Sequence, residues 1–106
     1  MIGGNIVAVL QQKNGSTLNA IGEKVQSWKD IHTLNGWLDQ MTGDSKYTYN
    51  AKIQESTHIF LCDYASVDRK PDDKRLVVNG AQYDVLMIDD PMELHQQLEI
   101  FLRFVG

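Results

Sequence analysis

Three histidines, one cysteine and two pairs of adjacent carboxylates are the residues of this sequence that could bind a metal or catalyse a reaction. His58 and Cys62 lie four positions apart in an apolar run. If that run is a strand, the two share a face, but their Cα atoms lie about 13 Å apart, too far for direct proton transfer. A zinc site would also need His32 or His95 nearby, and the spacing matches no recognised set of ligands. We therefore expect no metal site, no cofactor and a buried, structural Cys62.

The carboxylate pairs are the remaining candidates for acid–base catalysis. Asp72 precedes Asp73 directly after a proline, and Asp89 precedes Asp90 directly before one. Adjacent residues of a strand point to opposite faces, and acids beside proline usually lie in solvated turns. No glycine-rich phosphate-binding loop is present. The sequence thus offers no catalytic residue, and we expect that the protein is not an enzyme.

Composition limits the classes of protein that remain. The chain has 106 residues, of which 42% are hydrophobic, enough for one core. Ten basic against fourteen acidic residues give a net charge of −4, which argues against duplex-DNA binding. One cysteine excludes an internal disulfide, no apolar run approaches the roughly 18 residues of a membrane span, and the N-terminus does not resemble a signal peptide. We expect a soluble, intracellular single domain over residues 1–106, with no membrane partner.

Short apolar or alternating segments predict β-strands in the first half of the chain. Residues 6–10 are apolar and rich in β-branched side chains, and in residues 23–28 Val25 and Trp28 stand among polar residues, which we interpret as a strand with one solvated face. Between them, Asn14 and Gly15 form a dipeptide typical of turns. We therefore expect a turn at Asn14 and Gly15.

The apolar side chains of residues 33–41 do not keep a strict period of two. A glycine inside a strand often marks a bulge or a bend. A bulge at Asn35 and Gly36 would restore the alternation, so we expect one there.

The second half of the chain contains the strongest local signal. Residues 56–64 are apolar on both faces at their centre and predict an interior strand. Residues 75–78 and 81–88 flank Asn79 and Gly80, a dipeptide that readily adopts the positive φ values of a type I′ turn. We expect a β-hairpin here.

The last segment fits two structures. Asp90, Pro91 and Glu93 match the start of a helix, and apolar residues follow at helical spacing. The same apolar residues also alternate as in a strand. Because the preceding segments are strands, we expect a final strand after one helical turn at residues 91–95. The chain is thus expected to be mainly β: a small antiparallel β-barrel of six to seven strands, whose closure removes exposed edges.

One long polar loop interrupts this pattern. A loop of about this length in a compact domain is uncommon and often functional. Its residues are Thr42, Gly43, Asp44, Ser45, Lys46, Tyr47, Thr48, Tyr49, Asn50, Ala51, Lys52, Ile53 and Gln54.

Aromatic residues leave a single-strand nucleic-acid-binding barrel as an alternative function. Tyr47 and Tyr49, with lysines nearby, and Tyr64 and Tyr83 could stack on bases. The alternative interpretation places the tyrosines on rims and the other large aromatic residues in the core: Trp28, Trp37, Phe60, Phe101 and Phe104. The net charge of −4 favours the second interpretation.

Two motifs lie in the middle of the chain. Residues 35–43 read Asn-Gly-Trp-Leu-Asp-Gln-Met-Thr-Gly, and residues 53–60 read Ile-Gln-Glu-Ser-Thr-His-Ile-Phe. They resemble the motifs G-[YW]-L-D-x-x-[ST]-G and E-S-T-H of the tailed-phage head–tail joining (head closure, head-completion) proteins of Gram-positive phages and prophages. The resemblance extends over residues 6–105.

The resemblance implies a β-barrel connector protein without catalytic activity, located in the virion neck and in the host cytoplasm during assembly. Copies of it would form a ring, twelve-fold by resemblance, below the portal or adaptor protein. This ring would retain the packaged DNA and present a docking surface to a tail-terminator or tail-completion protein. Residues 42–54 match the loop that in related proteins enters the central channel or contacts the neighbouring subunit.

The resemblance also bears on DNA and on the alternative assignment. DNA would pass through the ring without sequence-specific binding, because an acidic or neutral lumen repels phosphate and lets the strand slide. A tail-completion or other neck protein of similar fold is the alternative within this class.

Overall fold

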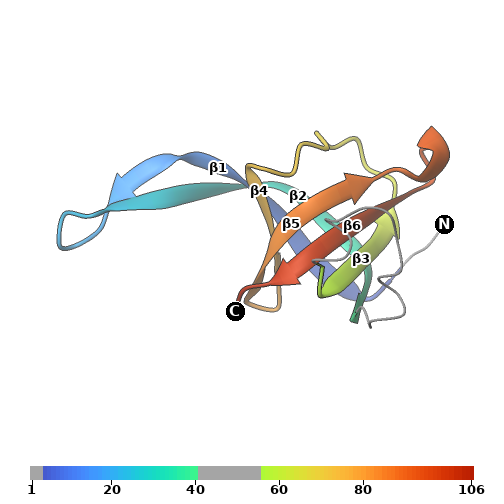
Figure 1. Ribbon diagram of the computed structural model, residues 1–106, viewed down its shortest axis with the longest axis horizontal. Coiled ribbons are helices and arrows are strands. Elements are labelled where there is room, and N and C mark those ends of the chain that lie inside the picture. Colours follow the sequence, from blue (N-terminus) through green and yellow to red (C-terminus); the bar gives the residue numbers. More distant parts are fainter. Residues whose placement is uncertain (1–3, 41–55) are drawn as a thin grey trace.

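The computed structural model describes residues 4–40 and 56–106. In these residues, six strands close into one antiparallel barrel in the order β1-β2-β3-β6-β5-β4 (Figure 1). The strands are β1 (Ile6–Leu18), β2 (Lys24–Gln40), β3 (His58–Asp63), β4 (Lys74–Val78), β5 (Ala81–Asp89) and β6 (Gln97–Phe104). The predicted mainly β fold and its small antiparallel barrel are confirmed. Among the described residues, no helix has both the length and the apolar character needed to span a membrane.

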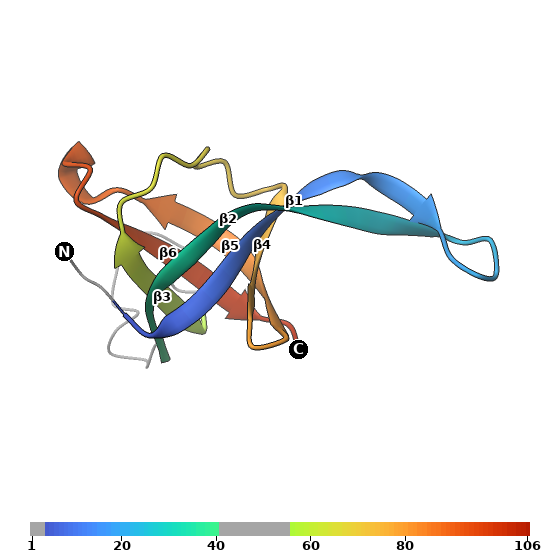
Figure 2. The ribbon, with the colours of Figure 1, turned by 180° about the vertical axis from the view of Figure 1, so that it is seen from behind.

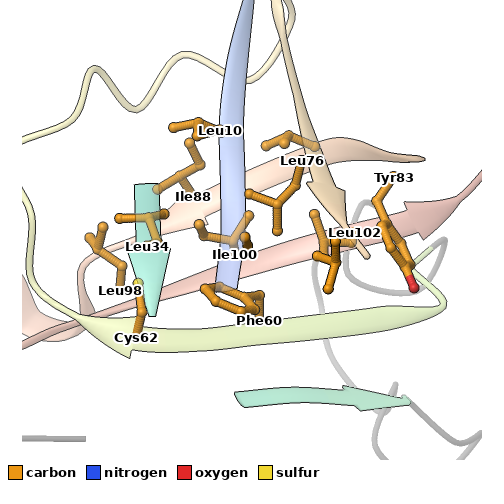
Figure 3. Packing of buried hydrophobic residues seen from close by; sticks show 13 residues of the cluster. Leu10, Leu34, Phe60, Cys62, Leu76, Tyr83, Ile88, Leu98, Ile100 and Leu102 are labelled. Atoms are coloured by element: carbon orange, nitrogen blue, oxygen red, sulfur yellow. The ribbon is translucent and has the colours of Figure 1, made fainter. Parts of the chain in front are cut away.

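The barrel is filled by inward-pointing side chains from all six strands (Figure 3). Phe60 of β3 has no exposed surface, and Leu10 of β1 and Ile100 of β6 are equally buried. Burial alternates along β4 and from Gln97 to Ile100 of β6, as expected where one face of a strand is inside. The core therefore sits within the closed sheet and not between two separate layers.

β1 and β2 continue beyond the barrel as a two-stranded ribbon, which we call the arm (residues 13–29). β1 pairs with β4 only over residues 8–12, and β2 pairs with β3 only over residues 36–40. Figures 1 and 2 show the ribbon projecting far from the barrel, and the longest dimension of the molecule is 45 Å. A single long hairpin thus contributes two barrel strands and an extension.

The expected turn at Asn14 and Gly15 is wrong. Lys13 pairs with Trp28 and Ser16 with Gln26, so two residues of β1 bulge opposite one residue of β2. Gly15 takes a φ of 72°, which suits a bulge glycine, and its carbonyl accepts a hydrogen bond from the Gln26 side chain. The freedom of glycine to adopt a positive φ, which made a turn plausible at Gly15, allows a bulge there instead.

The chain turns instead after Leu18, at the tip of the arm. The Asn19 side chain accepts hydrogen bonds from the backbone N–H groups of Ile21 (3.1 Å) and Glu23 (2.9 Å). Gly22 supplies a φ of 83°. An asparagine that bonds to its own following backbone is a common way to fix a turn.

The expected bulge at Asn35 and Gly36 is also wrong. β2 is in regular register here, with Ile6 opposite Gly36, and the irregularity lies earlier, at Ile31. Gly36 occupies an inward position where a Cβ atom would lie 2.0 Å from the carbonyl oxygen of Leu61. Trp37 is the next, outward residue. The alternation looks broken only because the inward position lacks a side chain and the outward one holds a large aromatic.

Both predictions for the C-terminal half hold. The hairpin between β4 and β5 turns at Asn79 (φ 50°) and Gly80 (φ 83°), as a type I′ turn requires. A 3-10 turn, η2 (Pro91–Glu93), then precedes β6. β6 closes the sheet by pairing with β3 on one side and with β5 on the other, and its core residues point into the barrel.

The expectation of solvated acids beside proline is wrong for Asp90, which is buried. Its carboxylate accepts a hydrogen bond from the His95 backbone (3.1 Å), and its second oxygen lies 2.5 Å from His95 Nδ1. The chain folds back within and just after η2, with positive φ values at Met92, Glu93 and His95. This reversal brings His95 over Asp90 and removes the carboxylate from solvent.

Candidate interaction surfaces

The antiparallel register places different features at the two ends of the barrel. One end, the arm end, holds the start of the arm, the connection over residues 64–73 and η2. The opposite end, the C-terminal end, holds the β4–β5 turn beside the C-terminus (Figure 1). β2 also ends and β3 also begins there, where Gln40 pairs with His58. A molecule with two such unlike ends can contact two different neighbours.

The predicted loop over residues 42–54 lies outside the described residues. Its flanking strand ends, Gln40 and His58, are adjacent in the sheet at the C-terminal end. The role expected for this loop therefore stays a prediction.

The Ser-Thr-His part of the second motif fastens the last strand. Ser56 is fully buried, and the Thr57 N–H donates a hydrogen bond to the carbonyl of Leu102 (2.8 Å). The Thr57 hydroxyl in turn accepts a hydrogen bond from the N–H of Phe104 (2.8 Å). The His58 ring packs edge-on against Tyr83, with centroids 5.2 Å apart. These contacts hold β6 in the barrel.

The first motif divides into a packing residue and an exposed one. Gly36 is required by its close approach to β3, as the Cβ distance shows. Trp37 points outward and is 46% exposed, and Asp39 on the same face is exposed as well. An exposed tryptophan has no packing task in the barrel, which makes it a candidate contact for another protein.

Cys62 is buried, as predicted, at 1% exposure. Burial, with a smaller contribution from the neighbouring Asp63 carboxylate, raises the pKa of its thiol to about 11. A thiol that stays protonated is a poor nucleophile and a poor metal ligand.

One group of potential metal ligands occurs in the described residues. Asp90, Glu93 and His95 offer ligand atoms within 4.8 Å of one another. Asp90 is already bonded to His95, and Glu93 forms two hydrogen bonds with Arg69 (2.8 and 3.0 Å). The Arg69 guanidinium lowers the pKa of Glu93. These contacts hold η2 against the connection over residues 64–73. Each of the three side chains thus already has a hydrogen-bond partner within the protein.

The expected division of the aromatic residues is partly wrong. Phe60 is in the core, but Trp37 and Phe104 are about half exposed. Tyr83, expected on a rim, is only 6% exposed and belongs to the core. It therefore has no free face for a base. Tyr47 and Tyr49 lie outside the described residues.

Lys74, at the arm end, is a buried cation held by three oxygen atoms. Its ammonium donates hydrogen bonds to Asp68 (3.1 Å), Asp73 (3.0 Å) and the carbonyl of Lys70 (2.8 Å). The Lys74 hydrogen bonds hold the pKa of both carboxyl groups below their usual range. This cluster fixes the connection between β3 and β4.

The base of the arm is fastened to the barrel by Arg75 of β4. Its guanidinium lies 4.3 Å from the centre of the Trp28 ring, and its Nε donates a hydrogen bond to Gln11 (2.7 Å). Gln11 in turn donates to Asp30 (2.7 Å). These bonds link β4, β1 and β2 where the arm leaves the barrel, so its direction is set by the fold.

The arm was not expected from the sequence. Its outer half is exposed, including three apolar side chains at or near the tip: Leu18 (69%), Ile21 (78%) and Val25 (44%). The turn signal of Asn19 with Gly22 was available in the sequence. It was obscured by the stronger dipeptide Asn14 and Gly15.

Comparison with known proteins gives a family and a fold. A family model described as phage head completion protein matches residues 6–103. A search of curated proteins found no match. Among solved structures, the solution structure of protein SF1141 from Shigella flexneri 2a is similar, with a TM-score of 0.71 and 18% sequence identity. The alignment covers 100% of this chain and 96% of that one.

Proposed function

The chain belongs to the phage head completion protein family, and from this we propose that copies of it form a ring that closes the DNA-filled head and presents a docking surface to the tail. The observation that carries the proposal is the match over residues 6–103, nearly the whole chain. Membership implies a structural protein of the virion neck that associates with other head and tail proteins.

The barrel geometry supports a connector with two faces. The arm end and the C-terminal end expose different residues on opposite sides of one rigid closed sheet. We assign one end to the portal or adaptor protein and the other to a tail-terminator or tail-completion protein. A closed barrel suits this task because it keeps the distance between its two ends fixed.

The net charge of −4 supports passive passage of DNA. DNA must leave the head quickly, and an acidic lumen repels phosphate. In this proposal the loop over residues 42–54 lines the channel or contacts the neighbouring subunit. In this proposal the protein surrounds the DNA path as a structural component and uses no cofactor.

A mixing experiment tests the function. Purified DNA-filled heads that lack the protein are incubated with it, and then with tails. We expect the protein to bind the heads, to protect their DNA from nuclease and to allow tails to attach. Binding to free tails alone would assign it to tail completion instead and would overturn the proposal.

The loop is tested in the same assay by deleting residues 43–50. We expect the deletion to leave the thermal unfolding of the barrel nearly unchanged, because none of the described core residues is removed. DNA retention or tail attachment should be lost. Full infectivity of particles carrying the deletion would contradict the role assigned to the loop.

A further inference from the structure

We propose that the arm of one copy binds the outer face of the barrel of the next copy in the ring. This inference rests on the proposed ring and names the contact that builds it. The receiving surface is a row of outward residues that face one another across four strands, which we call the cross-strand row. It consists of Trp37 (β2), Leu61 (β3), Glu99 (β6) and Asp89 (β5).

The tip of the arm has the composition of a contact surface. A two-stranded hairpin alone is only marginally stable in water. Leu18 and Ile21 nevertheless place 69% and 78% of their surface in solvent at its end. Leu18 is directly opposite Lys24, so an apolar and a cationic side chain share one face of the ribbon. Such a tip fits a surface that is apolar on one side and acidic on the other.

The cross-strand row has this composition. Trp37 is 46% exposed and pairs with the half-buried Leu61, which forms the apolar part. Glu99 and Asp89 are directly opposite each other in β6 and β5. Like charges in this position destabilise a sheet, and within residues 4–40 and 56–106 neither forms an ion pair. A cation supplied by another molecule would relieve this repulsion.

Charge also favours a second copy as the occupant. The arm holds three lysines and one glutamate, which give it a formal charge of +2, and the rest of the chain then carries −6. An arm of one copy and the barrel of another therefore attract each other. Two barrels without this contact would repel.

The anchored base of the arm lowers the entropy cost of the contact between copies and fixes the direction in which the arm points. Arg75 holds Trp28 and Gln11 at the root of the arm, so little freedom is lost when the tip binds. The arm and the cross-strand row are different surfaces of the same chain. An interface between unlike surfaces produces a ring when the rotation between neighbours closes.

A reciprocal charge exchange tests the proposal in DNA-filled heads. Lys24→Glu should lower the number of copies per head at least tenfold, and Glu99→Lys should do the same. The double variant should restore incorporation, because the attraction is re-formed with its polarity reversed. Lys29→Glu, the same charge change at an exposed site at the base of the arm and away from its tip, is the matched control and should bind normally.

A disulfide links the two surfaces directly. Ile21→Cys combined with Asp39→Cys, which neighbours Trp37 on the same face, should give a ladder of covalent multimers in oxidised particles. The buried Cys62 should leave the unaltered protein without a ladder. Particles that carry full rings but show no ladder, or a cross-link only to a different protein, would overturn the arm contact and leave the proposed function standing. Failure of the unaltered protein to bind heads would overturn the proposed function itself.

Discussion

Gly36 and the adjacent Trp37 obscure the alternation of apolar and polar residues that is typical of a strand. The glycine sits inside the barrel where β3 approaches too closely for a side chain, and the tryptophan stands outside. The sequence pattern contained the glycine signal but could not distinguish a bulge from a close approach. Burial of Cys62 and the turn at Asn79 with Gly80 were predictable because both follow from local sequence.

Replacement of Gly36 by alanine should destabilise the barrel by about 2 kcal/mol, because the new Cβ would lie 2.0 Å from the Leu61 carbonyl oxygen. Urea denaturation measures the change. The matched control is Asn35→Ala, the exposed neighbour, which should unfold at nearly the same urea concentration as the original chain. Equal stability of the two variants would contradict the close approach.

The Lys74 cluster predicts a loss of stability in acid. The pKa values of Asp68 and Asp73 are lowered in the folded state by their hydrogen bonds to Lys74. Their stabilising contribution is therefore complete above the usual carboxyl pKa and is lost as the pH falls through the lowered folded values, below about pH 4. Thermal unfolding should show the melting temperature falling in this range.

The double variant Asp68→Asn and Asp73→Asn isolates this contribution. It should melt lower than the original chain at neutral pH and depend less on pH in acid. Asp72→Asn, an exposed acid of the same turn, is the control and should retain the original acid dependence. An unchanged acid slope in the double variant would contradict the role of the cluster.

At the scale of elements, the strands that line the barrel were predictable and the arm was not. β3, β4, β5 and β6 bury alternate or central apolar residues, and such patterns are visible in a sequence. The arm buries nothing on either face along its outer half. A strand was expected over residues 23–28, but a segment without an inward face gives no sign of where it lies relative to the core, so its extension beyond the barrel could be found only in three dimensions.

The register of the arm permits a clean deletion. Removing residues 16–27 leaves Lys13 and Trp28, which are cross-strand partners, joined by Asn14 and Gly15 as a two-residue turn. The shortened chain should keep its far-ultraviolet spectrum and melt within a few degrees of the original, because all core residues remain. Its incorporation into heads as a ring should be lost. A shortened chain that still forms rings would show that the arm is dispensable.

For the whole molecule, the family could be identified from two short motifs, and the structure shows why they suffice. Gly36 allows β2 to approach β3, and Thr57 fastens β6, so both motifs act at the closure of the barrel. Their residues fix the fold directly. The binding partners cannot be identified from the motifs in the same way. An exposed residue such as Trp37 indicates a contact surface but does not indicate which molecule binds there.

The acidic chain should bind neither single-stranded nor duplex oligonucleotides at physiological salt. The net charge is −4, and Tyr83 is buried, so neither counterion release nor base stacking on this residue is available. Fluorescence anisotropy with labelled oligonucleotides measures this. Tight binding that weakens as salt is added would favour the nucleic-acid-binding alternative.

The stacking of Arg75 on Trp28 has a consequence for symmetry. In a circle built through the arm, the tilt of the ribbon against its own barrel sets the angle between successive copies. That angle determines how many copies complete the circle and how wide the central hole is. A single cation–aromatic contact would then tune the bore of the neck, and a variant that changes the tilt would produce a spiral instead of a closed collar.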